Sequence, residues 1–186
     1  MTPAQRADAA RNRERLLDTA RLAVDAGDLS LQLNEVARQA GVGVGTAYRH
    51  FRTRRALVEA LADPTFTALL DDARTAARHP DAGRGVAHFL RALLERQLAD
   101  PAFFEVVSTG PEHDAAPRTT GHREEFAELA RTVVERARDA GAVRAGLTDD
   151  DLHHLVCGTA FALRISGDPQ GRLDAYLKVI LDGIRA

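Results

Sequence analysis

Residues 32–51 read QLNEVARQAGVGVGTAYRHF, and this stretch decides what kind of fold the chain has. Apolar residues recur at helical spacing in its first half, and Gly41 stands where a left-handed residue would end that helix. A second short helix is predicted from Val44 to Phe51. Two helices joined by a short glycine turn form a helix-turn-helix, and its second helix can lie in the DNA major groove.

The same region is strongly basic. Five arginines and no acidic residue occur between positions 38 and 55. They are Arg38, Arg49, Arg52, Arg54 and Arg55. A run of this kind is typical of a surface that binds the phosphate backbone, although taken alone it is equally typical of a solvated face. Its position on a two-helix motif favours the first interpretation.

The block from Leu33 to Leu61 carries a set of short motifs. They are Val36-Ala37, Gly41-Val42, Gly45-Thr46, Tyr48-x-His50-Phe51, and a basic residue three positions beyond Phe51 that leads into Ala56-Leu57. On these residues the block resembles the DNA-binding domain of the TetR family of bacterial transcriptional repressors. The family usually opens the first of the two helices with Thr or Ser, whereas Leu31-Gln32 stand there in this chain, and Gln caps a helix poorly.

The resemblance and the helical periodicity of the chain predict an all-α protein, a three-helix head followed by a helical body, with about nine helices in all. We expect the head to cover residues 1–62 and the ligand-binding and dimerisation body to cover residues 63–186. The head holds ten arginines against seven acids, net +3, and the body holds fifteen basic residues against twenty acids, net −5. This split favours contact with DNA through the head.

Eight residues of the motif region are predicted to contact DNA. They are Val44, Gly45, Thr46, Tyr48, Arg49, His50, Arg52 and Arg54. Arg49 can pair with a guanine or bind a phosphate, and Thr46 can meet either a base edge or a phosphate. The other polar members are expected at phosphates, and the resemblance implies that contact for the Tyr48 hydroxyl. The valine and glycine at the helix tip permit a thymine-methyl contact and a close approach of the backbone.

The remainder of the head is predicted from composition and periodicity. Residues 1 to about 12 are polar and are expected to form an arm that frays in the absence of DNA. The first helix is predicted from Arg11 to Ala26. Leu29, Leu31 and Leu33 are expected to complete the small core of the head.

Proline and glycine residues interrupt the predicted helices of the body. Thr53 is predicted to cap a helix in which Pro64 produces either a break or a kink. Residues 109–121 contain two prolines and two glycines, and we expect an irregular segment there. A helix is predicted from His122 to Ala140, and Thr148 followed by three aspartates predicts the start of another.

The last two predicted helices carry more apolar surface than one chain easily covers. In TetR-like proteins the final two long helices pair with those of a second copy, so the resemblance implies a homodimer; the alternative is that they are core helices of a monomer. The predicted interface residues are Leu152, Leu155, Val156, Thr159, Leu163, Tyr176, Leu177 and Ile180. Two heads on a twofold axis would read a pseudo-palindromic operator in double-stranded DNA.

Helical bodies of the TetR family commonly hold an apolar ligand cavity, and the resemblance implies one here. The candidate pocket residues are Phe66, Leu70, Phe89, Leu93, Gln97, Phe104, Phe126 and Phe161. Aromatic residues at helical spacing are, however, more often plain core. Gln97 falls on the apolar face of its helix, so its amide needs a partner, which a water, a neighbouring side chain or a ligand could supply.

The sequence gives little support to several other classes of protein. Cys157 is the only cysteine, which excludes an intrachain disulfide, and no apolar run reaches the length of about 18 residues that a membrane span needs. We therefore expect a cytoplasmic protein with no membrane partner. The histidines lack metal-ligand spacing, so we predict neither a metal site nor a cofactor.

The sequence predicts a sequence-specific DNA-binding transcriptional regulator, and specifically a repressor that a small apolar or amphipathic ligand releases. One alternative is a DNA-binding protein that responds to no ligand. Another is a helical enzyme that uses Asp149, Asp150 and Asp151 with nearby histidines, but the chain has no nucleophile motif or glycine-rich phosphate loop. We therefore expect no enzymatic activity.

Overall fold

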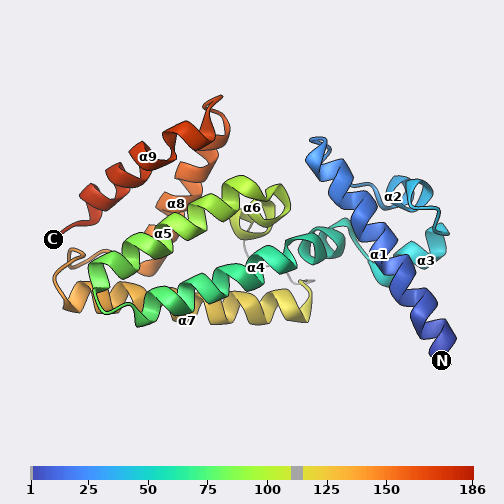
Figure 1. Ribbon diagram of the computed structural model, residues 1–186, viewed down its shortest axis with the longest axis horizontal. Helices are drawn as coiled ribbons and strands as arrows, with labels where there is room; N and C mark the ends of the chain where they lie inside the picture. The colour runs from blue at the N-terminus through green and yellow to red at the C-terminus, as the bar shows by residue number, and fades with distance from the viewer. Residues whose placement is uncertain (1, 110–114) are drawn as a thin grey trace.

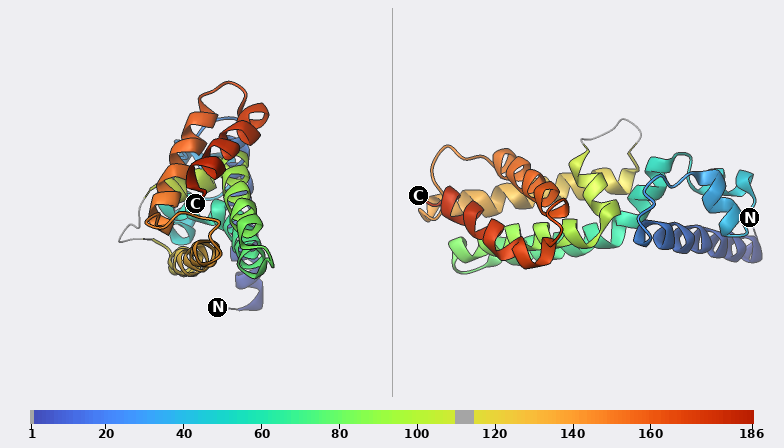
Figure 2. Two further views of the ribbon diagram at one scale, coloured as in Figure 1. Left: turned by 90° about the vertical axis from the view of Figure 1, so that its left-hand side faces the viewer. Right: turned by 90° about the horizontal axis from the view of Figure 1, so that it is seen from above.

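The computed structural model describes residues 2–109 and 115–186, which form nine helices and no strand (Figure 1). The helices are α1 (Pro3–Asp25), α2 (Leu33–Gln39), α3 (Val44–His50), α4 (Arg54–Arg78), α5 (Ala82–Ala99), α6 (Pro101–Ser108), α7 (Pro117–Asp139), α8 (Asp149–Arg164) and α9 (Pro169–Ile184). The predicted all-helical class is confirmed. The molecule is elongated, with α1–α3 at one end and α5–α9 at the other (Figures 1 and 2).

The head is built around a small core that α1, α2, α3 and the segments between them share. Its buried apolar residues are Leu16, Ala20, Val24, Leu31, Leu33, Val36, Ala37, Val42, Ala47 and Phe51. Leu29 is 40% exposed, so the prediction that it belongs to this core is wrong. Leu31 is buried and has a left-handed φ of 42°. The spacing of apolar residues in the sequence does not reveal this backbone conformation.

Residues 3–12 are helical, which corrects the prediction that this part of the N-terminal arm frays, and Met1 lies outside the described residues. α1 begins at Pro3 because Thr2 and Gln5 form a reciprocal capping box. The Thr2 hydroxyl accepts from the Gln5 amide at 3.3 Å, and the Gln5 side chain accepts from the Thr2 amide at 2.9 Å. Threonine followed three residues later by glutamine is the local signal for this start, and proline suits the first helical position.

α4 joins the head to the body. Thr53 caps it as predicted, because its hydroxyl accepts a hydrogen bond from the Ala56 amide at 3.1 Å. Pro64 lies inside the helix, which continues to Arg78, so Pro64 does not end it. Apolar residues on both sides of Pro64 are buried against neighbouring helices, and this packing offsets the one hydrogen bond that proline cannot donate.

The body is a bundle in which α4, α5 and α7 pack against one another along its length (Figure 1). α6 packs on α4 and α5, and α8 and α9 pack on α5 and on each other. Gly85 permits the tight α4–α5 turn, since a Cβ there would lie 2.8 Å from the Ala76 carbonyl oxygen. None of the helices described is long and apolar enough to cross a membrane.

α7 begins at Pro117, five residues before the predicted start at His122. Proline fits the first turn of a helix, where its missing amide hydrogen has no intrahelical partner to bond. The irregular segment predicted for residues 109–121 is therefore wrong for residues 117–121, and residues 110–114 lie outside those described. Further along, Thr148 starts α8 as predicted, in a capping box with Asp151.

Candidate nucleic-acid interface

α3 is a seven-residue helix held against the head by one buried face. Gly41 adopts a φ of 63°, which ends α2 and lets the chain turn into α3. Gln32 makes no side-chain hydrogen bond at the start of α2, in agreement with its poor capping ability. Ala47 is fully buried and Phe51 caps the helix from inside the core, so the opposite face of α3 points outward.

The outward face of α3 carries most of the predicted DNA-contact residues. Val44 is 45% exposed and Tyr48 is 43% exposed, Gly45 and Arg49 are exposed, and His50 is half-buried. Among the described residues, neither the Tyr48 hydroxyl nor the Arg49 guanidinium has a hydrogen-bond partner. Thr46 is half-buried, and Arg52, directly after the helix, is exposed.

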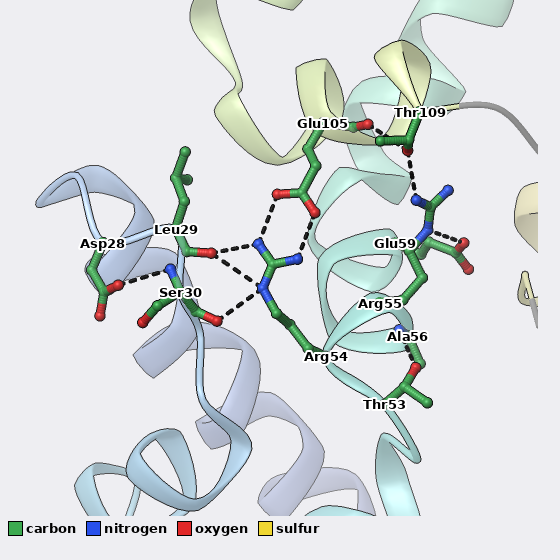
Figure 3. A network of polar contacts seen from close by, with 10 residues as sticks. All are labelled: Asp28, Leu29, Ser30, Thr53, Arg54, Arg55, Ala56, Glu59, Glu105 and Thr109. Carbon is green, nitrogen blue, oxygen red and sulfur yellow. Dashed lines mark hydrogen bonds and ion pairs between the residues drawn. The ribbon is translucent and has the colours of Figure 1, made fainter. Parts of the chain in front are cut away.

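Arg54 differs from the other predicted DNA-contact residues because protein groups surround its guanidinium (Figure 3). It forms two parallel hydrogen bonds to the Glu105 carboxylate, at 2.6 and 2.8 Å. Its Nε donates to the carbonyl of Ser30 at 2.8 Å, and the guanidinium also donates to the carbonyl of Leu29. We therefore withdraw the predicted phosphate contact of Arg54.

Two further arginines of the basic run form ion pairs with glutamates, one pair on the surface and one buried. Arg38 forms an ion pair with Glu35 on α2, and these hydrogen bonds lower the pKa of Glu35 to about 2. Arg55 pairs with the buried carboxylate of Glu59, Nε to Oε1 at 2.8 Å. The fold also brings an arginine of α1 to the motif, one that was not predicted as part of the site: the guanidinium of Arg13 lies 5.3 Å from the ring centroid of Phe51. Its position follows from how α1 crosses the motif, which periodicity does not give.

The body contains a cavity of about 300 Å³ between α4, α6, α7 and α8. It is lined by Phe66, Val107, Arg123, Phe126, Ala127, Ala130, Asp149, Asp150 and His153. The Phe66 ring packs edge-on against Phe103 and Phe126, with ring centroids 5.4 and 6.3 Å apart. Most of the wall is therefore apolar and aromatic, and the polar groups gather at the start of α8 and on α7.

Of the predicted pocket residues, Phe66 and Phe126 line this cavity. Leu70, Phe89, Leu93 and Gln97 are buried in the core, and Phe104 packs against it, but none of these lines the cavity. Phe161 is 58% exposed on α8, so its assignment to the pocket is wrong. Gln97 is fully buried as expected, and neither of its amide atoms has a hydrogen-bond partner among the described residues.

The polar groups of the cavity are partly fixed by their surroundings. Arg123 donates to the backbone carbonyls of Val106 and Thr109 at the end of α6. Burial lowers the pKa of His153, which favours the neutral ring, and burial raises the pKa of Cys157, whose sulfur lies 3.7 Å from the His153 Nε2. Within the described ranges, no group of three or more His, Cys, Asp or Glu side chains is placed to hold a metal ion.

The predicted interface residues on α8 and α9 fall into two sets. Leu155, Thr159 and Tyr176 line a groove of about 700 Å³ on the surface of α8 and α9. The other five are buried in their own protomer, because those residues pack toward α5 and between the two helices. These five are Leu152, Val156, Leu163, Leu177 and Ile180, and they are corrected from interface to core.

Comparison with known proteins identifies both parts of the chain. Residues 16–61 match the bacterial regulatory proteins of the tetR family, and residues 81–186 match the C-terminal domain of SbtR-like transcriptional regulators. A comparison with curated proteins finds no match. The two family matches lie on either side of the part of α4 that joins the head to the body.

Solved structures give the same result. A TetR transcription regulatory protein from Mycobacterium vanbaalenii is 32% identical over 98% of this chain and 99% of its own, with a TM-score of 0.53. PfmR from Thermus thermophilus is 18% identical over 93% of this chain and 96% of its own, with a TM-score of 0.65, and shows likeness of fold alone. FadR from Bacillus subtilis, solved with stearoyl-CoA, is 14% identical over 92% of this chain and 99% of its own, also with a TM-score of 0.65 and likeness of fold alone.

The C-terminal match covers more than half of the chain, and the Mycobacterium relative is similar over nearly its whole length. The chain therefore belongs to the TetR family of bacterial regulatory proteins, and it is a DNA-binding transcriptional regulator.

Proposed function

We propose that this regulator is a homodimeric repressor that binds a pseudo-palindromic operator and is released by a small apolar or amphipathic molecule. Residues 1–62 would read DNA, and residues 63–186 would dimerise and bind the effector. We also propose that it acts in the cytoplasm, where its DNA target lies. The observation that carries the proposal is the outward face of α3, where two polar side chains, Tyr48 and Arg49, have no hydrogen-bond partner among the described residues. A continuous α4 joins this face to a helical body that contains a cavity.

For the DNA contact, we propose that Arg49 reads a base edge and that the Tyr48 hydroxyl binds a phosphate. A guanidinium without an internal partner can form the bidentate pair with guanine that is common in major-groove recognition. Val44, Gly45 and Thr46 lie at the first turn of α3, where a base edge or a phosphate is within reach of a short side chain. His50 and Arg52 are proposed as phosphate contacts because both lie beside the end of the helix.

For the dimer, the proposal rests on apolar side chains that the protomer leaves exposed. Leu155 and Phe161 on α8, Ile165 directly after it and Val179 on α9 are all large and exposed. Exposed apolar surface of this kind is typical of an interface, and small residues such as Gly158 allow a second helix to come close. A twofold pair of heads would double the number of base pairs read.

For the effector, the apolar and aromatic wall of the cavity supports a small molecule with an apolar body. A volume of about 300 Å³ lies at the lower end of the range for small-molecule sites, so a bulky ligand would fill it only in part. FadR from Bacillus subtilis shares this fold and holds stearoyl-CoA. That relative supports the proposal of an effector in a body of this shape.

The proposal is tested by selecting DNA fragments from the source genome with the purified protein and footprinting the bound sites. We expect one protected pseudo-palindrome with two half-sites and binding that weakens as salt rises. Apolar and amphipathic compounds that raise the melting temperature should also weaken binding to that fragment, since a ligand shifts states only through differential affinity. If such compounds stabilise the protein but leave DNA affinity unchanged, the protein is a ligand-independent regulator.

A further inference from the structure

Arg54 joins the entry of the DNA-reading unit to its exit. This unit consists of α2, the glycine turn and α3, and Arg54 is the first residue of α4, which follows it. The Arg54 Nε donates to the carbonyl of Ser30 at 2.8 Å and to that of Leu29 at 3.2 Å, and its Nη2 also donates to Leu29 (Figure 3). The two ends of the unit are therefore held together at its base.

The chain that enters α2 has a strained backbone. Leu31 has a φ of 42°, a left-handed conformation that residues with a Cβ rarely adopt. Its side chain is buried in the core of the head. A residue in this conformation persists only where its surroundings hold it, and Arg54 binds the two carbonyls directly before Leu31.

α2 also begins without a side-chain cap. Gln32 occupies the N-cap position with a φ of −63° and a ψ of 119°, and its side chain makes no cap hydrogen bond there. The first turn therefore lacks the acceptor that a serine or threonine would supply to its amides. Glu35 lies at the third helical position, where it would complete a capping box with such a residue, but in this chain it pairs with Arg38 and Gln39.

The outer edge of the Arg54 guanidinium is bound by Glu105 of α6. The Nη1 donates to Oε1 at 2.6 Å and the Nη2 donates to Oε2 at 2.8 Å. All three guanidinium nitrogens thus donate to protein groups, and the planar fork is held in one orientation with its Nε toward the two carbonyls before α2. A lysine has a single ammonium group and does not reproduce this arrangement.

We propose that Arg54 is a positioning residue for DNA reading: it holds the uncapped start of α2, and through α2 the orientation of α3, without touching DNA itself. This inference rests on the proposed reading of DNA by α3 and names a residue that sets its specificity. Because α2 packs on α3, a loose start of α2 lets α3 meet the groove at more than one angle. Base contacts depend on that angle, whereas contacts to the phosphate backbone depend on it much less.

The competing interpretation makes Arg54 a phosphate contact, in line with its place in the basic run. Removal of a phosphate contact weakens specific and non-specific duplexes about equally and reduces the slope of log affinity against log salt concentration by about one. A phosphate contact also tolerates lysine, which supplies the same charge. Loss of a positioning residue instead lowers the ratio of specific to non-specific affinity and leaves the salt slope unchanged.

The first measurement is fluorescence anisotropy over a range of salt concentrations, with the selected DNA fragment and a scrambled duplex. For Arg54→Met and Arg54→Lys we expect about a tenfold loss of affinity for the selected fragment, less than about a twofold loss for the scrambled duplex, and an unchanged salt slope. The matched control is Arg52→Met, at an exposed arginine two residues earlier, which should weaken both duplexes about equally and reduce the slope by about one for each head. If Arg54→Met behaves as this control does, or if Arg54→Lys binds like the native protein, the proposal is wrong.

The second measurement is a rescue experiment, which separates positioning from a general loss of stability. Gln32→Thr places a capping residue before Glu35 and fixes the start of α2, but it restores neither the pair with Glu105 nor a charge for phosphate. In the Arg54→Met background, Gln32→Thr should return affinity for the selected fragment to within about threefold of the native value. Gln39→Thr, at the last residue of α2, is the control and should give no rescue. Absence of rescue by Gln32→Thr would refute the role at α2.

Amide hydrogen exchange tests the same role without DNA. In Arg54→Met we expect residues 36–40 to exchange about tenfold faster than in the native protein, with residues 89–94 of α5 unchanged, and Gln32→Thr should reverse the change. Unchanged exchange in Arg54→Met would overturn the proposal. If exchange responds as expected but no genomic fragment is selected, the proposed operator is wrong, while the support of α2 by Arg54 stands.

Discussion

Individual side chains decide which part of the basic run is available to DNA. Arg54 and Arg55 form ion pairs with half-buried Glu105 and buried Glu59, so their charges are compensated within the protein, whereas the Arg38–Glu35 pair is exposed. Tyr48 and Arg49 have no such partner in the part of the chain that the structure describes. A count of arginines in the sequence therefore overstates the uncompensated charge of the basic run, because it cannot show which glutamate folds back onto which arginine.

We predict that Arg49→Ala lowers specific DNA affinity by about 1–3 kcal/mol, the usual contribution of a base-reading pair. Tyr48→Phe should cost less, because it removes one phosphate contact. Fluorescence anisotropy with the selected fragment and a scrambled duplex at fixed salt measures both effects. Arg78→Ala, exposed at the far end of α4, serves as control. Full specific affinity in both variants would remove these two roles.

Glu59 is a buried carboxylate with three donors. It accepts from Arg55 Nε at 2.8 Å, from the Ala116 amide at 2.7 Å and from the Thr119 hydroxyl at 3.1 Å. Glu59→Gln removes the charge opposite Arg55 and turns an amide group toward other donors, so we predict a loss of about 3 kcal/mol in the free energy of unfolding. Urea unfolding measures the loss against Glu124→Gln, an exposed site on α7. A midpoint equal to that of the control would contradict this role.

Helix starts are the elements that sequence reports best, because a cap is made within three or four residues. Thr53 and Thr148 both cap the helices predicted for them, and the overlooked Thr2 follows the same rule. The sequence does not decide whether Pro64 breaks or kinks α4, because proline disfavours a helix interior while packing against other helices favours a continuous helix. Helices on both sides of the bundle bury the flanking turns, and that packing keeps the helix continuous.

The α4–α5 contact gives a test of element packing. In Gly85→Ala the new Cβ would lie 2.8 Å from the Ala76 carbonyl oxygen and 3.3 Å from the His79 Cβ. Since backbone must shift to make room, we predict a destabilisation of about 1–3 kcal/mol despite the better helix propensity of alanine. Gly121→Ala, with open space around its Cβ, should instead stabilise α7 by about 0.5–1 kcal/mol. Thermal unfolding of the two variants should therefore shift in opposite directions.

The proposed homodimer would assemble through the exposed apolar face of α8 and α9. We predict that Leu155→Glu converts the dimer to monomers and weakens operator binding by at least tenfold, because two linked heads no longer bind together. Sedimentation velocity measures the mass and anisotropy measures the affinity. Leu22→Glu is a suitable control, since Leu22 is exposed on α1 away from this face. A Leu155→Glu protein that remains dimeric would place the interface elsewhere.

The cavity is where prediction from sequence is weakest. Phe66 and Phe126 line it, whereas five of the other predicted pocket residues are simply core and one is exposed. Val107, Ala127 and Ala130 were not identified. A cavity exists where four helices leave space between them, and the periodicity of each helix reports only which face turns inward.

The DNA-reading motif and the helical class follow from local rules: apolar spacing, glycine at Gly41, and short polar caps act within a few residues of one another. Distant contacts set the rest. The withdrawal of Arg54 from the DNA surface depends on Glu105, 51 residues away, and the burial of Leu163 and Leu177 depends on α5 packing against α8 and α9. The preference of a segment for a helix or a turn depends on neighbouring residues. The partner of a charge or of an apolar face is fixed only when separate helices pack together.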